Sequence, residues 1–175
     1  LSTTDWTGTA IKDDTNALQP PANEDYVTAE TKESYNIGSY FEVAFNFVFG
    51  NCENNVYGDV GVIFGTNQIR IKSMGERRNE TYYAVVSNST GTVATATIGN
   101  TDDLVKGTYT FTYKNGKLSG TLNDKVINWT VDNSTATSVS VTFDEAATPI
   151  KLTIGGNWST NRYVKDFSFK GAING

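Results

Sequence analysis

The chain has 175 residues, enough for one domain with a full hydrophobic core, and 38% of its residues are hydrophobic and 12% aromatic. Its formal net charge of −5, with Lys and Arg scattered along the chain, argues against binding to nucleic acid or to an anionic membrane. The absence of histidine excludes Ser-His-Asp and Cys-His catalysis and the common zinc sites, and Cys52, the one cysteine, has no partner for an internal disulfide.

No apolar run is long enough to span a bilayer, so membrane insertion is not expected. The chain begins at Leu1 rather than Met and ends on Gly175 soon after an expected strand. We therefore expect a module excised from a longer polypeptide, with residues 1–175 forming a single domain. Residues 1–34 are polar and weakly patterned, and Trp6 and Ile11 mark a short strand within 5–12. This segment is expected to wrap around the domain rather than form a second one.

Strands are expected to follow one another from Tyr40 onward. The aromatic and apolar residues of 41–49 alternate with Glu42, Ala44 and Asn46, which predicts a strand with one buried face. Further strands are predicted at 58–65, 68–72, 81–87 and 92–98. In the second of these Ile69 and Ile71 point inward, while Arg70 and Lys72 point outward.

The segment from Tyr109 to Leu122 carries the clearest local pattern. Apolar residues alternate with Thr and Lys on both sides of Asn115-Gly116. Asn-Gly favours a type I′ turn, because both central residues need positive φ. This segment is therefore predicted to be a β-hairpin.

Four more strands are predicted toward the C-terminus, at 126–131, 139–143, 150–154 and 163–173, the first of them placing Ile127, Trp129 and Val131 on one face. The chain thus contains about eleven short strands with frequent turns, and no stretch has helical periodicity. The pattern indicates an all-β fold, an antiparallel sandwich or barrel with minimal helix.

Two segments carry a resemblance to a known family. The strand from Ile150 runs into Gly155-Gly156, and the last strand closes with Phe169-x-Gly171-x-Ile173. This ending resembles that of concanavalin A-like, laminin-G-type jelly rolls, and the hairpin at 113–122 resembles that family's Tyr-x-Asn-Gly-x-Leu hairpin. The resemblance implies a jelly-roll β-sandwich with a lectin-like function, non-catalytic carbohydrate binding.

The low cysteine content and the abundance of Asn and Thr resemble the carbohydrate-binding modules of phage tail and baseplate proteins. That resemblance implies adhesion or host recognition through a cell-surface polysaccharide. It also implies a parent structural protein and a location outside the cell or on the virion surface. A structural or protein-interaction module without a glycan ligand is the alternative.

Glycoside hydrolases occur on the same fold. The retaining type carries Glu-x-Asp-x-x-Glu or Glu-x-Asp-x-Glu on one strand, because the reaction needs two carboxyl groups about 5 Å apart. No such run is present, and Glu42 is the one carboxylate of its strand. We therefore expect no enzymatic activity, and a glycan-cleaving enzyme that pairs Glu42 with Asp166 is a third hypothesis.

Sugar binding requires an aromatic surface beside hydrogen-bonding side chains, and three loops combine the two. The loop at 157–163 contains four candidate ligand-binding residues: Asn157, Trp158, Arg162 and Tyr163. The loop at 51–59 contains Asn54 and Tyr57, together with Glu53 and Asp59, whose oxygens suit calcium. No other cofactor is expected.

The third loop, at 72–83, contributes Arg77 as a candidate ligand-binding residue. A sheet face is a further candidate, because the outward residues Glu42, Asn46, Arg70 and Lys72 are expected to line a groove or to form an ordinary hydrated face.

Overall fold

The computed structural model describes residues 5–8, 11–12, 17–19, 26–49, 59–74, 81–100, 102–144, 146–155 and 162–173. Within these ranges nearly every element is a strand, and the single helix is the four-residue α1 (Asp102–Val105). None of these residues belongs to a helix with the length and apolarity to cross a bilayer. The all-β prediction is confirmed.

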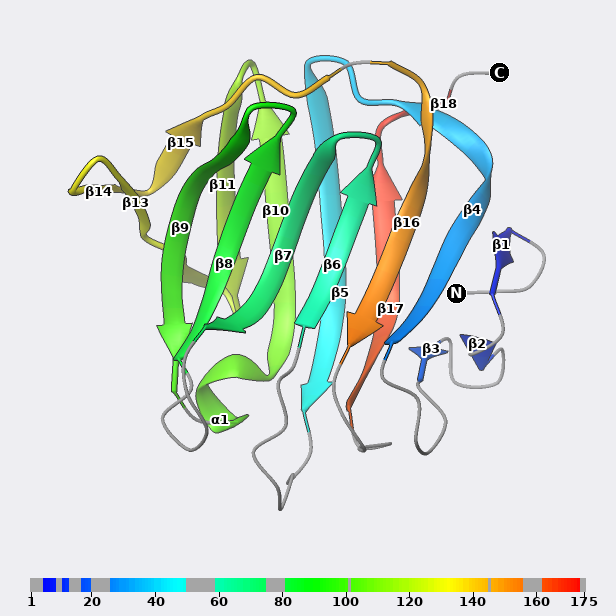
Figure 1. Cartoon of the computed structure of the whole chain (residues 1–175), viewed down its shortest axis with the longest axis horizontal. Helices are drawn as coiled ribbons and strands as arrows, with labels where there is room; N and C mark the ends of the chain where they lie inside the picture. The colour runs from blue at the N-terminus through cyan, green and yellow to red at the C-terminus, as the bar shows by residue number, and fades with distance from the viewer. Residues whose placement is uncertain are drawn as a thin grey trace.

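The strands form two antiparallel sheets that face each other (Figure 1). The larger, ten-stranded sheet contains, in spatial order, β1 (Trp6–Thr7), β4 (Tyr26–Asn36), β16 (Thr148–Gly155), β6 (Asp59–Phe64), β7 (Asn67–Met74), β8 (Thr81–Asn88), β9 (Gly91–Gly99), β13 (Trp129–Val131) and β14 (Ser134–Ala136), with β18 (Ala172–Ile173) beside β4. The smaller, eight-stranded sheet contains β12 (Lys125–Val126), β11 (Lys117–Leu122), β10 (Gly107–Lys114), β5 (Tyr40–Phe49), β17 (Arg162–Lys170), β3 (Ala17–Leu18) and β2 (Ile11–Lys12), with β15 (Ser138–Ser140) beside β11.

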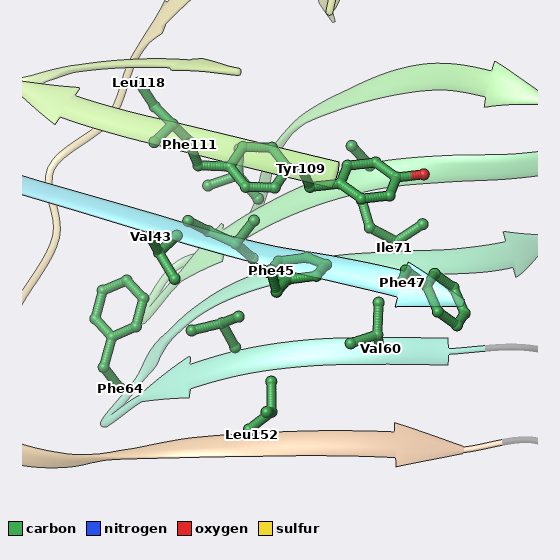
Figure 2. Packing of buried hydrophobic residues seen from close by; sticks show 14 of the residues in the cluster. Val43, Phe45, Phe47, Val60, Phe64, Ile71, Tyr109, Phe111, Leu118 and Leu152 are labelled. Carbon is green, nitrogen blue, oxygen red and sulfur yellow. The ribbon is translucent and has the colours of Figure 1, made fainter. Parts of the chain in front are cut away.

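The core lies between the sheets and is built by alternation along each strand. On β5 the inward residues Phe41, Val43, Phe45 and Phe47 are fully buried, as the sequence predicts. Figure 2 shows β5 and β10 packing their side chains against residues of β6, β7 and β16. Phe41 sits in an aromatic cluster, with its ring centroid 5.2 Å from that of Tyr113.

The predicted hairpin is confirmed in detail. Residues of β10 pair with β11 from Tyr109↔Leu122 to Lys114↔Lys117. The two turn residues between them, Asn115 and Gly116, have φ values of 51° and 82°. Both angles are positive, as a type I′ turn requires.

The predicted strand at 126–131 is wrong, because the chain changes sheets there. Val126 belongs to the smaller sheet and Trp129 to the larger one. Ile127 lies between the two strands, where its backbone N–H donates to the carbonyl of Gly120 at 2.9 Å. Ile127 and Trp129 are both buried because the crossing chain closes the edge of the sandwich.

Two other predicted strands are shorter than expected. β15 ends at Ser140, although Val141 and Phe143 remain buried. β17 ends at Lys170, and the following strand, β18, pairs with β4 of the larger sheet.

The longest strand, β4, was not predicted from the sequence. Its inward residues Val27, Ala29 and Thr31 are small or polar, so the segment has no strong apolar alternation. Pairing with β16 holds β4 in the larger sheet, so that its inward residues face the smaller sheet. The strand predicted at 5–12 is wrong, because β1 joins the larger sheet while β2, with β3, joins the smaller one. The N-terminal segment thus contributes short strands to both sheets.

The predicted groove lined by Glu42, Asn46, Arg70 and Lys72 is wrong. Glu42 and Asn46 alternate with the buried residues of β5, so they lie on the outer face of the smaller sheet. Arg70 and Lys72 alternate with buried Ile69 and Ile71, which places them on the outer face of the larger sheet. The hydrophobic core separates the two pairs.

Candidate functional site

The two leading candidate loops are rooted next to each other at one end of the sandwich. Residues 50–58 connect Phe49 of β5 with Asp59 of β6, and residues 156–161 connect Gly155 of β16 with Arg162 of β17. Asp59 pairs with Gly155 in the larger sheet, and Phe49 pairs with Arg162 in the smaller one. Neighbouring strands lie about 4.8 Å apart, so the two connections begin and end at adjacent points of the two sheets.

The third candidate loop is rooted at the same end. Residues 75–80 connect Met74, the last residue of β7, with Thr81, the first of β8. Because β7 runs antiparallel to β6, its last residue lies at the end where β6 begins. We call this end of the sandwich, at the bottom of Figure 1, the loop end. Six predicted site residues belong to these three connections and lie outside the described residues: Glu53, Asn54, Tyr57, Arg77, Asn157 and Trp158.

Asp59, a predicted calcium ligand, forms an ion pair with Arg70 on the outer face of the larger sheet. The Arg70 Nη2 atom donates to Asp59 Oδ2 at 2.7 Å, and Nε donates to Oδ1 at 3.2 Å. A third nitrogen, Nη1, donates to Oε1 of Gln68 at 3.1 Å. The two charged side chains are only 19% and 26% exposed, so the guanidinium group is held in one orientation.

The space for this guanidinium group is made by Gly61. Gly61 pairs with Arg70 across β6 and β7. A Cβ atom at Gly61 would lie 3.4 Å from Cζ of Arg70 and 2.8 Å from Oγ1 of Thr153. The guanidinium group therefore lies against the bare backbone of Gly61, and a glycine inside a strand is a signal for such a close approach.

Lys72 and Tyr83 extend this polar surface across the sheet. Lys72 is opposite Asp59 on one side and opposite Tyr83 on the other, and all three side chains are half-buried. Cβ atoms of directly opposite residues are about 4.5–5.5 Å apart. Asp59, Gln68, Arg70, Lys72 and Tyr83 form the outer-face cluster, which begins at the loop end. Sequence reasoning identified the outward direction of Arg70 and Lys72 but did not single out Tyr83.

Tyr163 and Arg162 lie on the other sheet. Tyr163 is half-buried and precedes the buried Val164, so its side chain is on the outer face of the smaller sheet. Tyr163 and Asp59 both lie at the loop end, but on opposite outer faces of the sandwich. The backbone of Arg162 pairs with Phe49, and its side chain lies outside the described part of the structure.

No carboxylate pair of the retaining type is found among the described residues of the central strands. The outward alternate positions of β7 hold Gln68, Arg70 and Lys72. Glu42 forms an ion pair with Lys170 at 3.6 Å. Asp166 lies in the bulge of β17 opposite residues 44–46, about 10 Å along the strand from Glu42, twice the separation that retaining chemistry needs. Within the described ranges, no group of three acidic or sulfur side chains is arranged to hold a metal ion.

A hollow of about 270 Å³ opens at the edge of the sandwich, between α1 and the turn that joins β11 to β12. Leu104 and Val126 are two of its apolar walls and are 53% and 55% exposed. Lys125, Asn123 and Asn128 supply its polar rim. The Asn123 side chain has a structural partner, since its Oδ1 accepts a hydrogen bond from the backbone N–H of Thr108.

The sandwich is similar to solved lectin domains across almost its entire length. It aligns over 97% of this chain and 83% of the VIP36 exoplasmic/lumenal domain, in a Ca²⁺- and Man₂-bound form, with a TM-score of 0.61 at 11% identity. It aligns over the same share of this chain and 89% of the Emp47p carbohydrate recognition domain, with a TM-score of 0.60 at 13% identity. A legume lectin-like domain from Entamoeba histolytica gives a TM-score of 0.59 at 11% identity over 97% and 91% of the two chains.

These likenesses establish the fold as the concanavalin A-like jelly roll of lectin domains, which confirms the predicted architecture. At this level of identity the likeness extends to the fold alone. No protein-family model matches the chain, and no curated protein matches it in sequence.

Proposed function

We propose that the chain is a non-catalytic carbohydrate-binding module whose ligand meets the loop end and the outer-face cluster. The observation that carries this proposal is the common root of the three candidate loops, adjacent to a cluster of oriented polar side chains. Supporting it, the sandwich shares its fold with the Emp47p carbohydrate recognition domain and with the VIP36 exoplasmic/lumenal domain, which was solved in a Ca²⁺- and Man₂-bound form.

The outer-face cluster offers the two kinds of contact that a pyranose needs. Tyr83 presents a half-buried aromatic ring to the apolar C–H face of a sugar. Arg70, bound to both Asp59 and Gln68, presents hydrogen-bonding groups in fixed positions, which lowers the entropy lost on binding. In this proposal Trp158 and Asn157 from one loop, and Tyr57 and Asn54 from the next, complete the contact.

A single site of this kind binds weakly, and repeated display on a larger assembly raises the overall affinity. We therefore propose an adhesion role, with a cell-surface polysaccharide as the partner and a parent structural protein as the carrier. The phage tail or baseplate setting, and a position outside the cell or on a virion, belong to this finer proposal. Calcium binding by Asp59 and Glu53 is also part of this finer proposal. It requires Asp59 to give up its ion pair with Arg70 and to bind the calcium ion instead.

The test is glycan binding by two site variants and a matched control. Trp158→Ala and Tyr83→Ala should each weaken binding to the best ligand of a glycan array at least fivefold. Tyr40→Ala is the control, because Tyr40 is 45% exposed at the start of β5, the opposite end of the sandwich from the loop end. If both site variants bind like the control, the proposed site is wrong.

The alternative is a protein-interaction module, and the hollow beside Leu104 and Val126 favours it. These are two of the three large apolar side chains exposed within the described residues. An apolar patch at an edge is suited to contact with another protein. In this alternative the chain binds no glycan, and Leu104→Ser lowers its affinity for the parent protein.

A further inference from the structure

A second hollow, of about 300 Å³, lies on the outer face of the smaller sheet, away from the outer-face cluster. Six of the residues that line it carry a hydroxyl group, and we call it the hydroxyl groove. These six residues are Thr110, Thr112, Ser119, Thr121, Thr137 and Ser138. Gly120 and Val126 complete the lining, so none of the described residues that line the groove is charged.

The strand register explains how the hydroxyl groups are brought together. Thr110 is directly opposite Thr121, and Thr112 is directly opposite Ser119, across β10 and β11. Ser119 is in turn opposite Ser138 of β15. Cβ atoms of such pairs are about 4.5–5.5 Å apart, close enough for both hydroxyl groups to contact the same sugar ring.

Beyond β11, the edge of the smaller sheet is formed by two separate short strands rather than by one. β15 pairs with β11 at residues 117–119, and β12 pairs with β11 at 121–122. Between them, the carbonyl of Gly120 accepts the backbone N–H of Ile127, where the chain leaves for the other sheet. The two short strands therefore extend the sheet beyond β11, and Val126 of β12, Ser138 of β15 and the preceding Thr137 line the groove on that side.

The hydroxyl groups of this groove are not used by the fold. None of the six side chains forms a hydrogen bond with another described residue. Each hydroxyl group can donate one hydrogen bond and accept two. Val126, 55% exposed, adds a single apolar contact beside them.

We propose that the hydroxyl groove is a second carbohydrate site, which binds an uncharged segment of a glycan. The inference rests on the proposed function and adds a site and a ligand class to it. Hydroxyl groups exchange hydrogen bonds with a neutral sugar at little cost. A uronate or sulfate group would be desolvated there without a cation to pair with, which is unfavourable.

The two sites are on opposite outer faces of the sandwich, with the core between them. One short oligosaccharide is therefore unable to occupy both, and a single chain binds two separate glycan strands. Binding two strands at once would cross-link a polysaccharide and raise avidity without a second copy of the chain.

The experiment is a methyl-NMR titration of the full chain with isotope-labelled threonine. Neutral hexasaccharides of glucose, mannose and galactose are the probes, added to 20 mM, and a galacturonate hexasaccharide is the charged comparison. We expect saturable shifts of the Thr110, Thr112 and Thr121 methyl groups with at least one neutral probe and none with the galacturonate. In the double variant Thr110→Val/Thr112→Val, affinity at the groove should fall at least fivefold, because Val keeps the shape and removes the hydroxyl group.

Thr130→Val is the matched control, since Thr130 is exposed on β13 and lies outside the groove. It should leave the titration unchanged. Shifts confined to the methyl groups of Thr81 and Thr97, which are next to Tyr83 on the outer face of the larger sheet, would overturn the groove inference and leave the proposed function standing. Equal binding of the galacturonate at the groove would overturn the ligand class. Absence of any shift with every probe would overturn the groove and count against the proposed function as well.

Discussion

Both carboxylate oxygens of Asp59 accept hydrogen bonds from the guanidinium group of Arg70, at 2.7 and 3.2 Å. Asp59 is the first residue after one candidate loop, and Arg70 lies near the middle of the next strand, β7. The ion pair thus fixes the point at which the loop enters the sheet. It also orients the guanidinium group on the outer face, where we place the ligand.

Arg70→Lys tests this arrangement. Lysine keeps the charge but has no planar fork to bind both oxygens of Asp59 and the Gln68 amide. We expect the free energy of unfolding to fall by about 1–3 kcal/mol, because partly buried polar groups lose their partners. Urea denaturation measures this loss. Lys151→Gln is the control: its ion pair with Glu30 spans 4.0 Å between side chains that are 44% exposed, so the change should be under about 0.5 kcal/mol.

Gly61→Ala tests whether Arg70 needs the bare backbone beneath it. The added methyl group would meet Thr153 Oγ1 at 2.8 Å and the Arg70 guanidinium group at 3.4 Å. We expect a stability loss of about 1–3 kcal/mol from the overpacking, together with weaker glycan binding. Ser87→Ala, on the next strand but one, is expected to change neither by a measurable amount. A Gly61→Ala protein with unchanged stability and binding would show that the close approach is unimportant.

Asn67→Ala tests a contact that sequence reasoning overlooked. Asn67 is fully buried, and its side chain both accepts from the backbone N–H of Asp144 at 3.0 Å and donates to the Asp144 carbonyl at 2.9 Å. Removing it leaves two backbone groups without partners, which should cost about 2–5 kcal/mol in all. Thermal and urea unfolding measure the loss, with the surface variant Asn46→Ala for comparison. Equal stability of the two variants would contradict this role.

The buried phenol of Tyr109 predicts a loss of stability in alkali. Its hydroxyl group donates to the carbonyl of Val105, and burial, with Tyr82 nearby, raises the pKa of Tyr109 well above its ordinary value. An unfolded tyrosine ionises near pH 10, while folded Tyr109 keeps its proton. Above about pH 10 the unfolded state therefore binds fewer protons, and stability falls by up to about 1.4 kcal/mol per pH unit from this group.

Tyr109→Phe should reduce the slope of stability against pH between 10 and 11 and leave stability at pH 7 lower by about 1 kcal/mol, the value of the lost hydrogen bond. Urea denaturation at several pH values measures both effects. An unchanged slope in Tyr109→Phe would assign the alkaline instability to other groups.

The strands with strong apolar alternation were predictable from the sequence, and those whose burial depends on partners were not. The residues of β5 and the hairpin around Asn115-Gly116 specify their own structure locally. By contrast, β4 buries Ala29 and Thr31 because pairing with β16 places it in the larger sheet, facing the smaller one. Trp129 alternates in register with Ile127, although the chain changes sheets between Val126 and Trp129.

The sequence allowed the loops of the candidate site to be predicted, but not which outward side chains lie on the same face of the sandwich. Loops rich in polar and aromatic residues are visible in the sequence, and their common root follows from the sheet topology. Which outward residues share a face depends on which sheet each strand joins. The sequence does not contain that assignment locally, and for this reason Glu42 and Arg70 were wrongly placed together.

The most direct test of the central claim is a glycan-array and polysaccharide pull-down measurement with the purified chain, in the presence of Ca²⁺ and then of EDTA. We predict saturable binding to a defined polysaccharide that Tyr83→Ala and Trp158→Ala weaken and Tyr40→Ala does not, with no shortening of the polysaccharide. Absence of binding to any glycan at millimolar concentrations would contradict the carbohydrate-binding account and favour the protein-interaction module.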